Sequence, residues 1–403
     1  MLDLARRGSG GGDLWAALRR AALVYAAANL LLAAVLIALN PEARAADLYL
    51  VYSWCRQWLL EGRRLYSLAA SPTDYPPHAI VLYAPLALLA WPAIVPVWAA
   101  FNAALAPLCA LLVARASSVG AAPAATLPAV VLFLCWGGVR MLLQFSRLSM
   151  VVAYGALLLV DTRPIASGLL LGCALAKPHI SGPIALWMIC TRRFKPLLAA
   201  AGVVALGFGV YALHVQGSPL LVAGRYWRVL TTLYASPQEY VGRTGLRAWA
   251  AAMAPDAAMA NAAWLAICAA LLVVPWRAAA ADGNWRTSRA GAAAPPLFCL
   301  WSLLVWFHLG NNLVLLAFPA FAFLLLVRDP PTRWPRRAVA AVMQAALMLD
   351  LPVNLRWLVP HLGAAGALVV HADRLVVIGA FAYLALLQRR LLSADAIRTP
   401  ASD

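Results

Sequence analysis

Apolar runs separated by short polar stretches make up most of the chain. They lie at 21–39, 79–91, 94–114, 122–143, 148–160, 165–191, 197–213, 257–275, 295–309, 312–327, 338–350 and 374–388. A helix that crosses a membrane needs about 20 apolar residues, and somewhat fewer where short helices pack inside a bundle. The pattern therefore predicts an all-α polytopic membrane protein with about 12 transmembrane helices.

Basic clusters lie between the runs and indicate on which side each loop emerges. The clearest are Arg19-Arg20, Arg192-Arg193-Phe194-Lys195 and Arg389-Arg390. Lys and Arg accumulate in cytoplasmic loops, so we expect residues 1–20 to form a cytoplasmic leader and residues 389–403 a cytoplasmic tail. Residues 21–403 are then a single integral membrane domain, in which 40–78 is the first outer loop and 214–248 the second.

Two cytoplasmic ends require an even number of crossings. If the run at 165–191 is split at Lys177-Pro178, about 13 runs result, so one of them does not cross. Either 165–191 is a single proline-kinked helix, or 122–143 is re-entrant. We favour the second interpretation, because it keeps Asp161 inside and brings Lys177 to the outer face.

Composition excludes a soluble protein. Of the 403 residues, 64% are hydrophobic and 12% are charged, whereas soluble domains have roughly half apolar and a quarter charged residues. The net charge of +17 does not indicate nucleic-acid binding, since the basic residues punctuate apolar runs and form no single solvated face. We therefore expect the lipid bilayer as a partner and no nucleic acid.

The sequence lacks the common motifs for nucleotide cofactors and metals. The seven cysteines show no CxxC pair or zinc-type spacing and lie mostly in apolar runs, which is typical of core-filling thiols. No GxxxxGKS/T, GxGxxG, HExxH or GxSxG motif occurs in a fitting context. Acidic residues are not clustered like metal ligands either. The sequence therefore predicts no cofactor and no metal.

The first outer loop contains an amphipathic segment at 46–66. Its apolar residues recur near helical spacing at Leu48, Val51, Tyr52, Leu59 and Leu60. This spacing predicts an amphipathic helix lying at the outer face of the membrane. Asp47 lies at its start, where it either caps the helix or, as one of only 15 acidic residues, serves as a general base.

The loop ends with Tyr75-Pro76-Pro77 and His78. Paired prolines hold an extended entry and fix where the next helix begins. His78 then lies at the mouth of that helix. There it either donates a hydrogen bond to a phosphate or is an ordinary interfacial histidine.

Polar residues that interrupt the other apolar runs are candidate anion-binding positions. Lys177, at a proline break, either faces an anionic headgroup or snorkels to the interface. Arg225 and Arg228, among the aromatic residues of the second outer loop, suit either an interfacial belt or a pocket for a sugar phosphate. Gln144 interrupts another run in the same way, and His308 lies in a polar turn.

The order of these landmarks resembles glycosyltransferase family 87, which belongs to the polytopic C-type glycosyltransferase fold. The matching residues are, in chain order, Asp47, Tyr52, Gly62, Tyr66, Tyr75-Pro76-Pro77, Gln144, Gly168, Gly172, Lys177, Pro178 and the cluster from Arg192 to Lys195. The resemblance covers roughly residues 20–215, and the C-terminal half matches mainly in hydropathy and at His308. One departure follows Gln144, where Phe145-Ser146 replace the usual x-Asn, so a ligand contact made by that Asn would be missing.

The resemblance implies an inverting, mannosyltransferase-like hexosyltransferase of the bacterial cytoplasmic (inner) membrane. Its donor would be a polyprenyl-phosphate-linked sugar and its acceptor a membrane lipid or envelope glycan, with the active site facing the periplasm or exterior. Asp47 would be the general base. The donor would be bound by Lys177, His78, Arg225, Arg228, Gln144 and His308, and the structural motif would comprise Tyr52, Tyr75, Pro76 and Pro77. The alternatives are a secondary transporter or lipid flippase, and a non-enzymatic partner in envelope assembly.

Overall fold

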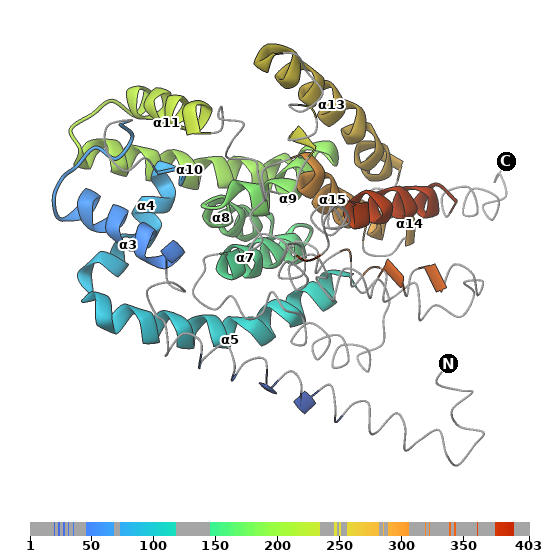
Figure 1. Cartoon of the computed structure of the whole chain (residues 1–403), viewed down its shortest axis with the longest axis horizontal. Coiled ribbons are helices and arrows are strands. Elements are labelled where there is room, and N and C mark those ends of the chain that lie inside the picture. Colours follow the sequence, from blue (N-terminus) through green and yellow to red (C-terminus); the bar gives the residue numbers. More distant parts are fainter. Residues whose placement is uncertain are drawn as a thin grey trace.

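The computed structural model describes residues 46–67, 73–117, 146–233, 256–281, 289–305 and 375–390, together with isolated positions elsewhere. Within these residues every regular element is a helix (Figure 1). This agrees with the all-α class that the apolar runs predict. The run at 122–143 and the candidates Gln144 and His308 lie outside the described residues.

Three helices are long and apolar enough to cross a membrane by length and composition. They are α5 (Trp91–Ser117), α10 (Phe194–His214) and α13 (Ala257–Ala281). Several other apolar helices are shorter, namely α4 (Pro77–Tyr83) with the 3₁₀ turn η2 (Ala84–Leu88), α7 (Ser146–Leu159), α8 (Pro164–Ala174) and α15 (Ala294–Val305). The described part of the chain is thus typical of a membrane protein, and the number of about 12 crossings stays a prediction.

The apolar run at 165–191 forms two helices and not one kinked helix. The first is α8, and the second is α9 (Pro178–Cys190), which begins with Pro178 at a position where its missing N–H costs nothing. The ends of the two helices that lie away from Lys177 are close together, since Arg193 Nη2 lies 3.1 Å from Asp161 Oδ1. The two helices therefore form a hairpin with Lys177 at its tip, and the single-helix interpretation is wrong.

Helices α10, α8, α7 and α5 pack side by side in that order (Figure 1). Glycines allow α8 to approach α10 very closely. A Cβ atom at Gly168 would lie 2.2 Å from the carbonyl oxygen of Pro196, and one at Gly172 would lie 2.6 Å from the Cβ of Val203. Small residues four positions apart permit this kind of contact between helices in membranes. This contact sets how far along α10 the tip of the hairpin lies.

The remaining helices cover the His214 end of α10 and the opposite side of the bundle. They are α3 (Ala46–Leu59), α11 (Pro219–Leu233), α14 (Arg289–Ala292) and an unlabelled helix at 375–390. Trp58 of α3 stacks on Tyr211 of α10 with 5.5 Å between ring centroids, and the Trp58 carbonyl oxygen lies 2.8 Å from His214 Nε2. In this way α3 is held against the end of α10.

The amphipathic helix expected over 46–66 is shorter than predicted. Leu48, Val51 and Tyr52 are buried as expected, but the helix ends at Leu59. Leu60 is exposed, and the chain turns at Gly62, whose φ of +63° disfavours residues with a Cβ. The predicted helix over 46–66 is therefore wrong in its last turns, because periodicity does not register the glycine that ends it.

Candidate active site

Asp47 and Lys177 form an ion pair. Asp47 lies in the first turn of α3 and Lys177 at the tip of the α8–α9 hairpin, 130 residues later in the chain. Lys177 Nζ is 3.3 Å from Asp47 Oδ2. The side chain of Lys177 is 4% exposed and that of Asp47 is 25% exposed. Two residues to which the sequence gives separate candidate roles thus lie together in one place.

Tyr75 completes this site from the segment before α4. Its hydroxyl donates a hydrogen bond to Asp47 Oδ1 at 3.5 Å, and its ring lies 5.3 Å from Lys177 Nζ. Burial raises the pKa of the Tyr75 phenol well above its usual value, and the neighbouring charge of Asp47 raises it further. Tyr75 is therefore a neutral hydrogen-bond donor at physiological pH.

The two prolines after Tyr75 set its position. Pro76 has extended backbone angles (φ −68°, ψ 155°) and directly precedes α4, and Pro77 occupies the first turn of that helix. Proline at this position fixes φ without losing a hydrogen bond of the helix. The expected rigid entry is confirmed, and it holds the aromatic ring of Tyr75 against Trp54 of α3, 5.8 Å between centroids.

Lys177 is buried and paired, whereas a snorkelling lysine keeps its ammonium group in water. An ammonium group taken out of water is costly unless it is paired and hydrogen-bonded. The Lys177 side chain is 4% exposed, and its Nζ lies beside Asp47 Oδ2 at the tip of the hairpin. The register of α8 on α10 places this tip near the level of Gly207, about 10 Å before His214 at the end of α10.

His78 is not part of the Asp47–Lys177 pair. It is 3% exposed and lies between α4 and α10, where a Cβ atom at Gly207 would be 2.3 Å from the Cβ of His78. Its ring stacks on Phe208 at 6.2 Å. The close approach of two helices buries His78, and both its interfacial position and its contact with a phosphate stay predictions. Tyr52 has a structural role. Its hydroxyl donates a hydrogen bond to the Leu89 carbonyl oxygen at 3.3 Å, which joins α3 to the residue that follows η2.

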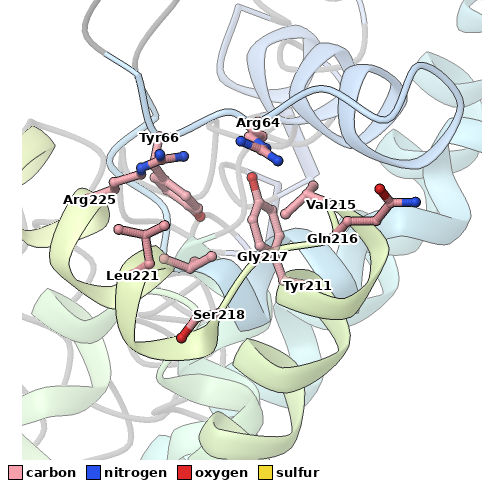
Figure 2. A pocket seen from close by; sticks show the side chains of 10 residues that line it. Arg64, Tyr66, Tyr211, Val215, Gln216, Gly217, Ser218, Leu221 and Arg225 are labelled. Atoms are coloured by element: carbon pink, nitrogen blue, oxygen red, sulfur yellow. The ribbon is translucent and has the colours of Figure 1, made fainter.

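The two arginines of α11 have different surroundings. Arg225 lines a cavity of about 140 Å³ together with Arg64, which the sequence analysis did not select (Figure 2). Arg228 is exposed and does not line this cavity. In the sequence, Arg64 stands out only by its place in a basic stretch, because Arg225, which lines the same cavity, is far away in the chain.

Tyr66 connects this cavity with Tyr75. The Tyr66 hydroxyl donates to the Tyr75 carbonyl at 2.8 Å, while its ring packs on Tyr211 at 5.2 Å. Burial raises the pKa of the Tyr66 phenol well above its usual value, so it remains a donor.

In the part of the chain that the structure describes, no three His, Cys, Asp or Glu side chains lie together as metal ligands would.

The arrangement provides three chemical functions in one place. The carboxylate of Asp47 can accept a proton, the ammonium of Lys177 can donate to an anionic oxygen, and Tyr75 orients the carboxylate. A quarter of the Asp47 side chain remains accessible to a reactant.

A family profile matches the middle of the chain, beginning after Asp47. The profile of glycosyltransferase family 87 matches residues 73–255, a range that includes Tyr75, Lys177 and Arg225. Neither the comparison with curated proteins nor that with solved structures gives a match. The match supports the resemblance inferred from the ordered landmarks over this range, and it indicates a glycosyltransferase.

Proposed function

We propose that this protein transfers a hexose, mannose in the first place, from a polyprenyl-phosphate donor to a membrane lipid or envelope glycan. The proposed site is the Asp47–Lys177 pair, facing the exterior of the bacterial inner membrane. The observation that carries the proposal is the 3.3 Å contact of a partly exposed carboxylate with a buried ammonium group. The family match favours transfer over the alternative of a transporter or flippase.

Asp47 is the proposed general base. An acceptor hydroxyl attacks the anomeric carbon of the sugar while its proton passes to a carboxylate oxygen of Asp47. The bond between that carbon and the phosphate oxygen breaks, and the polyprenyl phosphate leaves with the electron pair. A single displacement of this kind inverts the anomeric carbon. Because phosphate is already a stable anion, no nucleotide is needed to drive its departure.

Lys177 is the proposed partner of the leaving phosphate. An ammonium group has three donors, so Lys177 can keep its contact with Asp47 and reach a phosphate oxygen at the same time. In a site shielded from water, such a preorganised cation stabilises the charge that develops on the leaving group. Gln144 and His308 remain proposed donor-binding residues, and so does Arg228, although it lies away from the pair.

A double substitution distinguishes a catalytic role of the ion pair from a purely structural role. In Asp47→Asn, loss of the base lowers transfer by about 10²- to 10⁴-fold. It also destabilises the protein by roughly 3 kcal/mol, because Lys177 stays buried without its counterion. Adding Lys177→Met removes that buried charge. We expect the double variant to regain thermal stability and to remain inactive.

The assay follows labelled hexose from polyprenyl-phosphate mannose into the lipid and glycan fractions of membranes from a strain that lacks the protein. Asp161→Asn is the matched control. Asp161 also forms an ion pair with a basic residue, but its side chain is 41% exposed, so its loss costs at most about 1 kcal/mol. Recovery of transfer in the Asp47→Asn, Lys177→Met protein would show that the pair is only structural.

A further inference from the structure

A cavity beside the end of α10 lies apart from the Asp47–Lys177 pair. It has a volume of about 140 Å³ and lies between the segment after α3, the last turn of α10 and the first turn of α11 (Figure 2). Since a water molecule occupies about 30 Å³ in the liquid, the cavity has room for a compact group of several heavy atoms. Asp47, Lys177 and Tyr75 are not among its lining residues.

Two guanidinium groups give this cavity a strong positive charge. Arg64 and Arg225 come from different segments and lie on the same side of the cavity, over the rings of Tyr66 and Tyr211 (Figure 2). Among the described residues neither arginine has a carboxylate partner within ion-pair distance, whereas the adjacent Arg63 is paired with Glu61 at 2.9 Å. The cavity therefore contains two positive charges that its described lining does not neutralise.

A buried hydroxyl and the start of a helix add further donors. Tyr211 is 1% exposed and its hydroxyl accepts a hydrogen bond from the Leu65 N–H at 3.0 Å, which leaves the hydroxyl proton available to the cavity. Figure 2 shows this hydroxyl directed into the cavity near Arg64. The first turn of α11, with Ser218 and Leu221 in the lining, brings the positive end of a 15-residue helix to the same place.

This combination matches a phosphate group. Guanidinium forks bind phosphate oxygens in a bidentate manner, and both a tyrosine hydroxyl and a helix start can donate to the remaining oxygens. We propose that the Arg64–Arg225 cavity is a second phosphate-binding site, separate from the Asp47–Lys177 pair, which holds the phosphate of a lipid headgroup or free phosphate. This inference does not depend on Asp47 being the catalytic base.

The test measures binding to the purified full-length protein in detergent by calorimetry. Two probes are titrated separately, namely inorganic phosphate and the short-chain lipid dioctanoyl phosphatidic acid. The variants are Arg64→Gln and Arg225→Gln, and Arg63→Gln is the matched control because it removes the same charge one residue away. Loss of one charge-assisted contact should weaken binding about tenfold or more in the first two variants and leave the control unchanged.

The pattern of binding identifies the source of the phosphate. Binding of both probes that depends on Arg64 and Arg225 supports a site for the phosphate group itself, and binding of the lipid alone supports a headgroup site. Binding of neither probe, or binding that persists in both variants, overturns the proposal. Melting curves confirm that the variants are folded, and Arg225→Lys, which keeps the charge, should retain part of the affinity.

The same titrations in Asp47→Asn, Lys177→Met protein separate this inference from the proposed function. That protein should keep the phosphate binding that depends on Arg64 and Arg225, whether or not it transfers sugar. A loss of phosphate binding there would place the anion at the Asp47–Lys177 pair and overturn the assignment of a second site.

Discussion

Replacing Gly168 with Ala tests how the protein presents Lys177 to Asp47. The added Cβ would lie 2.2 Å from the carbonyl oxygen of Pro196 and 2.6 Å from the Cβ of Ala199. One of these neighbours is backbone, so no rotamer change relieves the contact. An ordinary contact begins near 3.4 Å, and α8 must therefore move about 1.2 Å away from α10.

This movement reaches the proposed active site because Lys177 lies three residues after the end of α8. The Nζ–Oδ2 distance is 3.3 Å, and a shift of about 1 Å in a catalytic group can lower the rate by about 100-fold. Overpacking of this kind also costs about 1–3 kcal/mol of stability. We therefore expect Gly168→Ala to lose about 100-fold in transfer rate while the protein still inserts and purifies.

Gly202→Ala is the matched control on the neighbouring helix. A Cβ at Gly202 meets nothing within 4 Å, and an Ala in a helix interior is favoured over Gly by up to about 1 kcal/mol. This variant should be fully active and as stable as the wild type or slightly more so. The labelled-hexose assay and melting curves are run on both proteins. If Gly168→Ala transfers sugar as fast as Gly202→Ala, the close helix contact does not position the proposed catalytic pair.

Three further predictions concern the surroundings of the site. Tyr75→Phe should slow transfer by less than about tenfold, since the hydrogen bond from Tyr75 to Asp47 is long at 3.5 Å. Because burial raises the pKa of Tyr75, its ionisation should not set the alkaline limit of activity. The pH–rate profiles of the wild type and of Tyr75→Phe should therefore fall at the same high pH. Gly62→Ala should lower the free energy of unfolding by about 1 kcal/mol, because φ is +63° there, and Gly62→Asn by less, as melting curves will show. In intact cells, Arg63→Cys should react with an impermeant maleimide, whereas Arg192→Cys should react only after permeabilisation. The unsubstituted protein gives the background labelling. Labelling of Arg63→Cys from the cytosol alone would refute the proposed orientation.

Hydropathy predicted the described helices well where the signal is local. The run at 197–213 became α10, and the run at 94–114 lies within α5. The sequence alone does not decide between one kinked helix and two helices at 165–191, because a Lys-Pro pair is compatible with a kink and with a break. The ion pair between Asp161 and Arg193 at the ends of the two helices decided between them.

The candidate site was predicted residue by residue but not as a set. Asp47, Lys177 and Tyr75 were all selected, and the structure brings these three together. His78 was selected for a similar reason and lies elsewhere, packed against Gly207. Arg64 was missed, because its significance depends on Arg225, which is far from it in the chain.

By itself, the sequence determined that the chain belongs in a membrane, where its apolar helices lie and which residue types are available for chemistry. These are local properties, since burial in lipid and helix formation depend on neighbouring residues. Only the tertiary structure decided which polar residues meet. That outcome depends on how closely the helices approach, and at Gly168, Gly172 and Gly207 the approach is set by contacts with partners that no local pattern specifies.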